Sequence, residues 1–201
     1  NSFEGVHRAS EIISSLKFFA SPVRDEKRVQ DLEKLLYPVL LDCQSRVPEN
    51  TRLVKKIEPG LSVRCFEEPL QQAFANILDN AIEAIESKEE RENELIELVA
   101  VKDTKSKLPL AHVTISNSGP LIPEEELNQV FDPFFTSKET GMGSGLGMTI
   151  SYLIIGEHQG TIKVSSGPGK GALFTLRFPA VVDTLKGDNH EQHDHLTETE
   201  Q

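Results

Sequence analysis

The chain has 201 residues, of which 37% are hydrophobic and 26% charged, a composition typical of a globular domain with a substantial core. The formal net charge of −11 argues against a nucleic-acid-binding surface, because phosphate groups need a basic face. Two cysteines, Cys43 and Cys65, are too few for a disulfide framework, and no apolar run reaches the roughly 20 residues of a membrane span. We therefore expect a cytoplasmic location, within a parent protein that can itself be membrane-anchored.

Two helices are expected at the start of the chain. Apolar residues at three- and four-residue steps predict the first over residues 3–20, ended by Ser21-Pro22, and the second around residues 26–46. The apolar stripe of the first helix needs a partner helix that its neighbours in the sequence do not offer. Short strands are expected near residues 52–57 and 62–66.

A long amphipathic helix comes next, and it carries an unusual pair of residues. Asn76 and Asn80 stand one turn apart beside its apolar face, in the stretch FANILDNAIEAI. Asparagine is a poor helix former because its amide competes for backbone hydrogen bonds. The pair either forms a polar edge that faces solvent or points at a ligand that needs both amides.

The second half of the chain supplies most of a sheet. Strands are expected at residues 95–101 and 112–116, a helix at 147–158, and a hairpin from 161–166 and 172–178 around the turn GPGKG. Helices on one face of such a sheet define an α+β fold. The expected architecture is a two-layer α/β sandwich, in which helices cover one face of a mixed, mostly antiparallel sheet, preceded by a further helix.

Three features of this part of the chain together describe a nucleotide site. The oxygens of the two asparagines suit magnesium, and Gly119 in NSGPLIP (117–123) lets the backbone approach a flat ring. The glycine-rich stretch 141–147 directly precedes a helix, where exposed amides and the positive helix end cradle phosphates, and Lys138 adds a positive charge. Each feature alone is weak, since glycines can mean mere flexibility.

The ordered set of motifs resembles the catalytic, ATP-binding domain of bacterial sensor histidine kinases, in the ATPase superfamily shared with gyrase, Hsp90 and MutL. The resemblance runs from about residue 3 to 179. Its boxes are NILDNAIEA (76–84), NSGPLIP (117–123), FDPFFTSK (131–138), GSGLGM (143–148) and GPGKGALFTLRFP (167–179). It implies that residues 1–22 are the C-terminal part of a dimerisation helix from a helix bundle, 23–182 the catalytic ATP-binding domain, and 183–201 an acidic, disordered tail.

The resemblance also implies ligands, partners and site residues. ATP and magnesium are the expected ligands, with Asn80 as the magnesium ligand and Asn76 near the phosphates. The expected partners are a cognate response regulator and a second copy of the chain, joined through the N-terminal helix bundle. The residues expected at the nucleotide are Asn76, Asn80, Glu83, Asn117, Gly119, Ile122, Phe131, Lys138, Gly143, Ser144, Gly145, Leu146 and Gly147.

One position separates kinases from hydrolases within this superfamily. Four residues before the metal asparagine, hydrolytic members have a glutamate that acts as the base for water, whereas this chain has Asn76. An amide does not accept a proton at neutral pH, which favours transfer of the γ-phosphoryl group to a histidine over hydrolysis. The alternative is a nucleotide-binding regulatory module with weak or no kinase activity, acting by conformational change or by supporting dephosphorylation of a response regulator.

The sequence departs from the family pattern in two places. The phosphoacceptor motif, a histidine followed by an acidic residue, is absent, and His7 is interpreted as an incidental surface histidine, so the acceptor lies on a segment largely missing from this chain. In the first glycine box, Asn117 replaces an aspartate and Leu121 a glycine. Asn117 can still accept from the adenine amine, so we expect weaker binding. Its amide can also flip and donate to guanine, unless a neighbouring backbone group fixes it.

Overall fold

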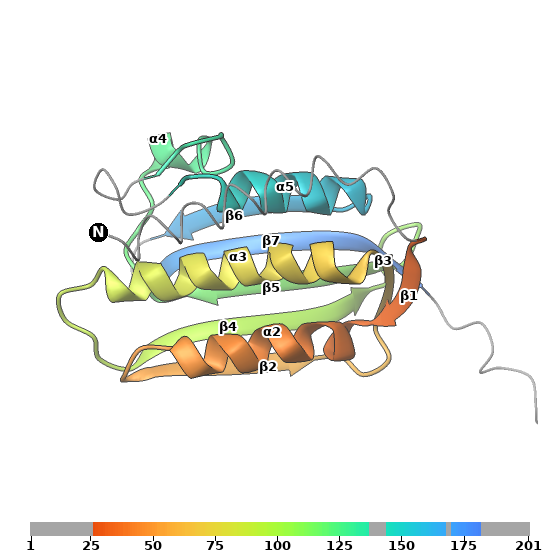
Figure 1. Ribbon diagram of the computed structural model, residues 1–201, viewed down its shortest axis with the longest axis horizontal. Helices are drawn as coiled ribbons and strands as arrows, with labels where there is room; N and C mark the ends of the chain where they lie inside the picture. Colours follow the sequence, from red (N-terminus) through yellow and green to blue (C-terminus); the bar gives the residue numbers. More distant parts are fainter. Residues whose placement is uncertain (1–25, 137–143, 168–169, 182–201) are drawn as a thin grey trace, which may run out of the picture.

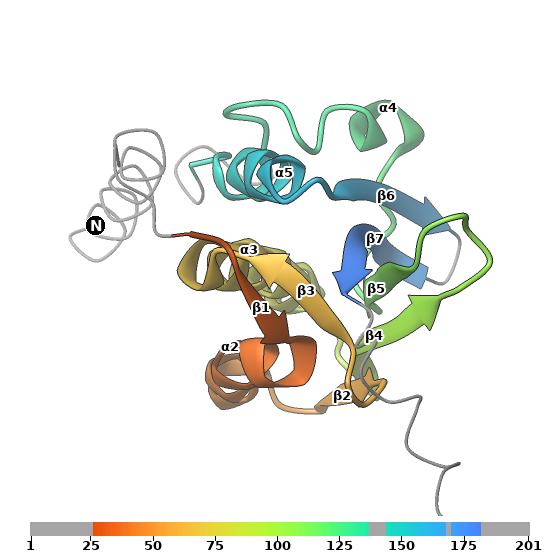
Figure 2. The same cartoon turned by 90° about the vertical axis from the view of Figure 1, so that its right-hand side faces the viewer.

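The computed structural model describes residues 26–136, 144–167 and 170–181, and in these residues helices cover one face of a single sheet (Figures 1 and 2). This arrangement confirms the two-layer α+β sandwich. The strands are β1 (Arg28–Asp31), β2 (Thr51–Ile57), β3 (Ser62–Cys65), β4 (Glu94–Asp103), β5 (Leu110–Asn117), β6 (Thr161–Gly167) and β7 (Lys170–Val181). The helices are α2 (Leu32–Arg46), α3 (Glu67–Glu86), the short α4 (Glu124–Leu127) and α5 (Gly147–Glu157).

The sheet is mixed and mostly antiparallel, as the sequence predicts. Its strand order is β1-β3-β7-β5-β4-β2, and β6 pairs with β7. The pair β2–β4 is parallel, whereas the other pairs are antiparallel. The end of β5 therefore lies beside both β4 and β7, beneath the C-terminal half of α3 (Figure 1).

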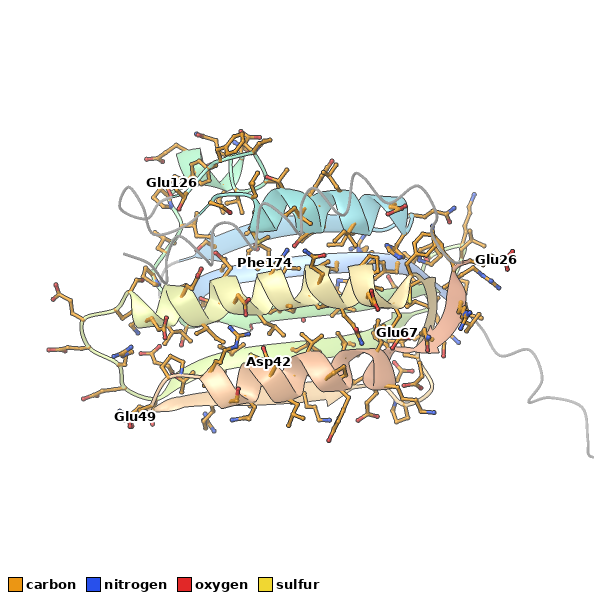
Figure 3. All side chains as sticks on the ribbon, viewed as in Figure 1. Glu26, Asp42, Glu49, Glu67, Glu126 and Phe174 are labelled. Carbon is orange, nitrogen blue, oxygen red and sulfur yellow. The ribbon has the colours of Figure 1, made fainter. Side chains whose placement is uncertain are left out.

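The core lies between the helices and the sheet. The apolar face of α3 is fully buried, and Phe174 of β7 lies beneath the helix layer, while acids such as Glu49 and Glu67 stand at the surface (Figure 3). Burial alternates along β5, so Asn117 faces the helix layer, as Val113 and Ile115 do. The end of the strand therefore places one polar side chain, that of Asn117, at the edge of the core.

Both cysteines are free and buried. Burial raises the pKa of the Cys43 thiol to about 11 and that of Cys65 to about 11, so neither is a reactive thiolate near neutral pH. Among the helices in the described part of the chain, none has the length and apolar character that a membrane span requires.

The second predicted helix begins later than the sequence suggests. The prediction of a helix from residue 26 is wrong, because residues 28–31 form β1 and pair with β3. Asp31 then caps α2, since its Oδ1 accepts a hydrogen bond from the backbone N–H of Lys34 at 3.0 Å. Val29 fits the helical spacing of apolar residues but is 46% exposed. The expected helix at residues 3–20 and the tail at 183–201 lie outside the described residues.

Candidate nucleotide site

The helix α3 carries three positions of interest along one line. Asn76, Asn80 and Ala84 follow one another at four-residue steps, so they lie on one side of the helix. At a rise of 1.5 Å per residue, they span about 12 Å along the axis. The first position meets the start of α5 and the last meets the loop after β5, so a single helix joins two segments that are remote in sequence.

Asn76 fixes the first turn of α5 against α3. Its Nδ2 donates to the backbone oxygen of Gly147 at 3.0 Å and to Oγ of Ser151 at 3.3 Å. The Ser151 hydroxyl lies in turn 3.3 Å from the backbone oxygen of Ala73 on α3. Both hydrogens of the Asn76 amide thus have acceptors, which leaves its Oδ1 as the atom available to a ligand.

Asn80 has no such internal role. Its half-buried amide makes no hydrogen bond with any residue in the described ranges 26–136, 144–167 and 170–181. Those ranges also contain no group of three histidine, cysteine or acidic side chains that would cage a metal. Magnesium keeps most of its waters and takes few protein ligands, so one amide oxygen without an internal partner fits it. Glu83 lies on the next turn of α3 and is also half-buried.

The loop after β5 closes tightly on the C-terminal half of α3. A Cβ on Gly119 would stand 2.8 Å from Cβ of Ala84, so only glycine permits this approach. The backbone N–H of Gly119 donates to Oδ1 of Asn117 at 2.9 Å. Asn117 is only 6% exposed, and its Nδ2 is buried without a hydrogen-bond partner. A neighbouring backbone group therefore holds the amide in one orientation.

The segment before α5 depends on a second close approach. Gly145 has a φ of +66°, and a Cβ there would stand 2.5 Å from the carbonyl carbon of Phe134. The Phe134 N–H donates to the Gly145 oxygen at 3.0 Å, and the Leu146 N–H donates to Oγ of Ser144 at 3.2 Å. The first bond joins the phenylalanine box to the glycine-rich box at the N-terminus of α5, and the second lies within the glycine-rich box.

Two further predicted residues lie on the flanks of this arrangement. Phe131 packs its ring on Tyr152 of α5, with centroids 5.5 Å apart. Ile122 is held at β6, because its N–H donates to Oγ of Ser166 at 3.0 Å. The structure thus brings Asn76, Ser144, Gly145, Leu146 and Gly147 together and places Asn117 and Gly119 against Ala84. Lys138 and Gly143 lie outside the described residues.

Sequence reasoning missed a buried acid next to the first glycine box. Glu94, with a side chain only 2% exposed, binds Lys88 Nζ at 2.5 Å and accepts from Oγ of Ser118 at 2.6 Å. Ser118 Oγ in turn accepts from the Leu95 N–H at 2.8 Å. Burial alone would raise the pKa of the Glu94 carboxyl, but the Lys88 and Ser118 hydrogen bonds and the Lys88 charge hold it below its usual range. No motif marks an acid at the start of a strand as a partner of this loop.

This network predicts an acid-sensitive contribution to stability. Since the folded pKa of Glu94 is depressed, its contribution is present above the unfolded value of about 4.3 and is lost as pH falls through the folded pKa. Glu94→Gln should lower the free energy of unfolding by about 2 kcal/mol at pH 7, and the deficit should shrink as the pH falls below 4. Urea unfolding across this pH range measures it. Glu97→Gln is the control, because the Lys56–Glu97 pair is exposed and should contribute less than about 1 kcal/mol. Equal losses for both variants would contradict the assignment.

The described residues also form one hollow away from this arrangement. It has a volume of about 470 Å³, and none of its lining residues lies on α3 or next to α5. The lining includes two arginines and consists of Asn50, Thr51, Arg52, Arg91, Glu92 and Asn93. It is a rival location for an anionic ligand.

Comparison with known proteins identifies the class of domain that this fold and arrangement define. The chain belongs to the histidine kinase-, DNA gyrase B- and HSP90-like ATPase family, whose family model matches residues 66–182. It is 31% identical over 180 residues to sporulation kinase A of Bacillus subtilis, covering 88% of this chain and 28% of that protein. It is also 32% identical over 172 residues to the histidine-protein kinase AtoS of Escherichia coli K12, a match that covers 85% of this chain and 27% of that protein.

A solved structure supports the same conclusion. The catalytic domain of histidine kinase ThkA, in a nucleotide-free form, is 29% identical and superimposes with a TM-score of 0.65, covering 77% of this chain and 98% of that one. Both curated relatives are named as kinases. The chain nevertheless spans less than a third of the length of either curated relative named above.

Proposed function

We propose that this chain binds ATP with magnesium along α3 and transfers the γ-phosphoryl group to a histidine on a dimerisation segment. The observation that carries the proposal is the alignment of Asn76, Asn80 and Ala84 on one side of α3. The start of α5 meets this line at Asn76, and the first glycine box meets it at Ala84. Phosphates, metal and base would then lie in this order along about 12 Å of helix.

The phosphate end of the proposed site is the N-terminus of α5. The first backbone N–H groups of an 11-residue helix have no acceptor within the helix, and its dipole favours negative charge there. Asn76 holds this helix end in place through the Gly147 oxygen, so the N–H groups need no rearrangement to meet a phosphate. The base end is the loop of Asn117 and Gly119, where glycine permits close approach of a flat ring.

The proposed metal ligand is Asn80. Magnesium, when bound, would neutralise negative charge on the phosphates. The free amide oxygen of Asn80 fits such an ion, and the Oδ1 of Asn76, one turn away, is available to a ligand because Nδ2 is bonded to Gly147. The two asparagines therefore have different proposed roles. Asn76 fixes the helix that binds the phosphates, and Asn80 binds the ion that accompanies them.

The side chains around Asn76 favour transfer over hydrolysis. An amide cannot act as a base for water, and both of its hydrogens are used to hold α5. The carboxylate of Asp79 is engaged on another side of α3, because its Oδ1 pairs with Nη2 of Arg46 on α2 at 2.6 Å. Catalysis then rests on positioning the γ-phosphoryl group for an incoming nucleophile. We propose two protein partners: a second copy of the chain, joined through the helix expected at residues 3–20, and a cognate response regulator. We also propose a cytoplasmic location.

Transfer of labelled phosphate tests this function. The chain is mixed with γ-labelled ATP, magnesium and a separately supplied dimerisation helix pair from its parent protein. We expect acid-labile label on the helix pair and none on the chain alone, since the sequence contains no phosphoacceptor motif. Release of inorganic phosphate without labelling of the helix pair would contradict the kinase assignment. Label on the chain itself that disappears in His7→Ala would instead overturn the interpretation of His7.

A further inference from the structure

We propose that Asn117 presents a hydrogen-bond donor to the base, so that the base subsite favours a purine with an acceptor at C6 over one with an amine. The inference rests on the proposed function, because it takes the nucleotide base to lie at the loop of Asn117 and Gly119. It concerns position 117, where this chain has an asparagine in place of the aspartate of its family. The ligand class that it names is a 6-oxopurine nucleoside triphosphate.

The orientation of the amide is set by its surroundings. Oδ1 of Asn117 accepts the Gly119 N–H at 2.9 Å, and a Cβ on Gly171 of β7 would overlap the same oxygen. Flipping the amide would bring Nδ2, a donor, against the Gly119 N–H, also a donor. The flipped state therefore loses one hydrogen bond and creates a repulsion, so the oxygen stays on the Gly119 side.

The other side of the amide is a buried donor that lacks an acceptor. Asn117 is 6% exposed, and Nδ2 has no hydrogen-bond partner among the residues that the structure describes. Nearly all buried polar groups in proteins are paired, so an unpaired one is a candidate for binding a ligand. The loop that carries this donor lies close against α3, because a Cβ on Gly119 would stand 2.8 Å from Cβ of Ala84.

The chemistry of the base edge follows from this orientation. An aspartate at position 117 would keep the Gly119 bond with one oxygen and accept from the adenine amine with the other. Asparagine replaces that second oxygen by an N–H donor, which faces the adenine amine donor to donor. An oxygen at C6, as in guanine or hypoxanthine, accepts from the same N–H. A site with a fixed donor discriminates against a ligand that leaves the donor unpaired.

Dissociation constants for ATP and ITP, measured by calorimetry with magnesium, test the inference. The bases of these nucleotides differ only at the C6 edge, so ITP probes this edge without the extra amine of guanine. We expect the wild-type chain to bind ITP at least as tightly as ATP. In Asn117→Asp the ratio of the ITP to the ATP constant should rise at least tenfold. Asn128→Asp adds the same charge at an exposed position outside the proposed site and outside the hollow lined by Arg52 and Arg91, and should leave the ratio unchanged.

Each outcome has a defined meaning. A wild-type chain that binds ATP more than tenfold tighter than ITP overturns the inference and leaves the proposed function intact, even if Asn117→Asp fails to fold. An unchanged ratio in a folded Asn117→Asp variant also overturns it, since adenine would then be bound through its N1 acceptor or through water. Failure of wild type, Asn117→Asp and Asn128→Asp to bind either nucleotide would overturn the proposed function as well.

Discussion

Replacing Asn80 with alanine is expected to remove the magnesium-dependent part of ATP binding while leaving the fold intact. The Asn80 amide has no partner in the described part of the chain, so its loss breaks no internal hydrogen bond. Alanine is also the better helix former, so the free energy of unfolding should change by less than about 1 kcal/mol. Loss of a metal-binding group should weaken ATP binding in magnesium by about 100-fold.

Calorimetric titrations with ATP, in magnesium and in EDTA, measure this effect. The wild type should bind much more tightly in magnesium, whereas Asn80→Ala should show nearly the same weak affinity in both buffers. Asn128→Ala removes an exposed amide just after α4, outside the proposed site, and should behave as wild type. Equal dependence on magnesium in the wild type and in Asn80→Ala would remove Asn80 from the metal site.

The same substitution at the two asparagines of α3 should have unequal effects on stability. In Asn76→Asp an oxygen replaces Nδ2 beside the Gly147 oxygen, so the Gly147 oxygen and the Ser151 hydroxyl lose a donor and two acceptors face each other. We expect a loss of about 3 kcal/mol in the free energy of unfolding at pH 7. Asn80→Asp breaks no such bond and should change it by less than about 1 kcal/mol.

Urea unfolding of the two variants measures the difference directly. Binding of ATP should also weaken in Asn76→Asp, because the start of α5 is no longer held against α3. If the free energy of unfolding falls equally in both variants, then Asn76 does not fix α5, and the two asparagines do not have the different roles proposed for them.

The elements that could be predicted are those whose local pattern agrees with their place in the fold. The apolar period of α3 requires one buried face, and the alternation in β5, β6 and β7 requires a sheet. The strand β1 was missed because Val29 and Leu32 also fit a helix, and only pairing with β3 decides between the two. The parallel register of β2 and β4 depends on the whole sheet and has no local signal.

In the candidate site, too, the sequence predicts the local contacts but not those between distant residues. The sequence predicts that Asn76 and Asn80 share a side of a helix, because this follows from helical geometry alone. It does not predict the bond from Asn76 to Gly147, which joins residues 71 positions apart. The bond from Gly119 to Asn117 spans two residues and is typical of an asparagine turn, so this signal was present in the sequence. From the sequence, the Asn117 amide could either flip or be fixed by a neighbouring backbone group, and in the structure the Gly119 N–H holds it in one orientation.

The proposed function is tested most directly by locating the bound nucleotide on the chain. An NMR titration of the isotope-labelled chain with magnesium and a non-hydrolysable ATP analogue reports this for each backbone amide. We expect the largest shifts along α3 from Asn76 to Ala84, at Gly119, and at residues 144–147. Shifts that gather instead at the hollow lined by Arg52 and Arg91, with α3 unaffected, would contradict the proposed site.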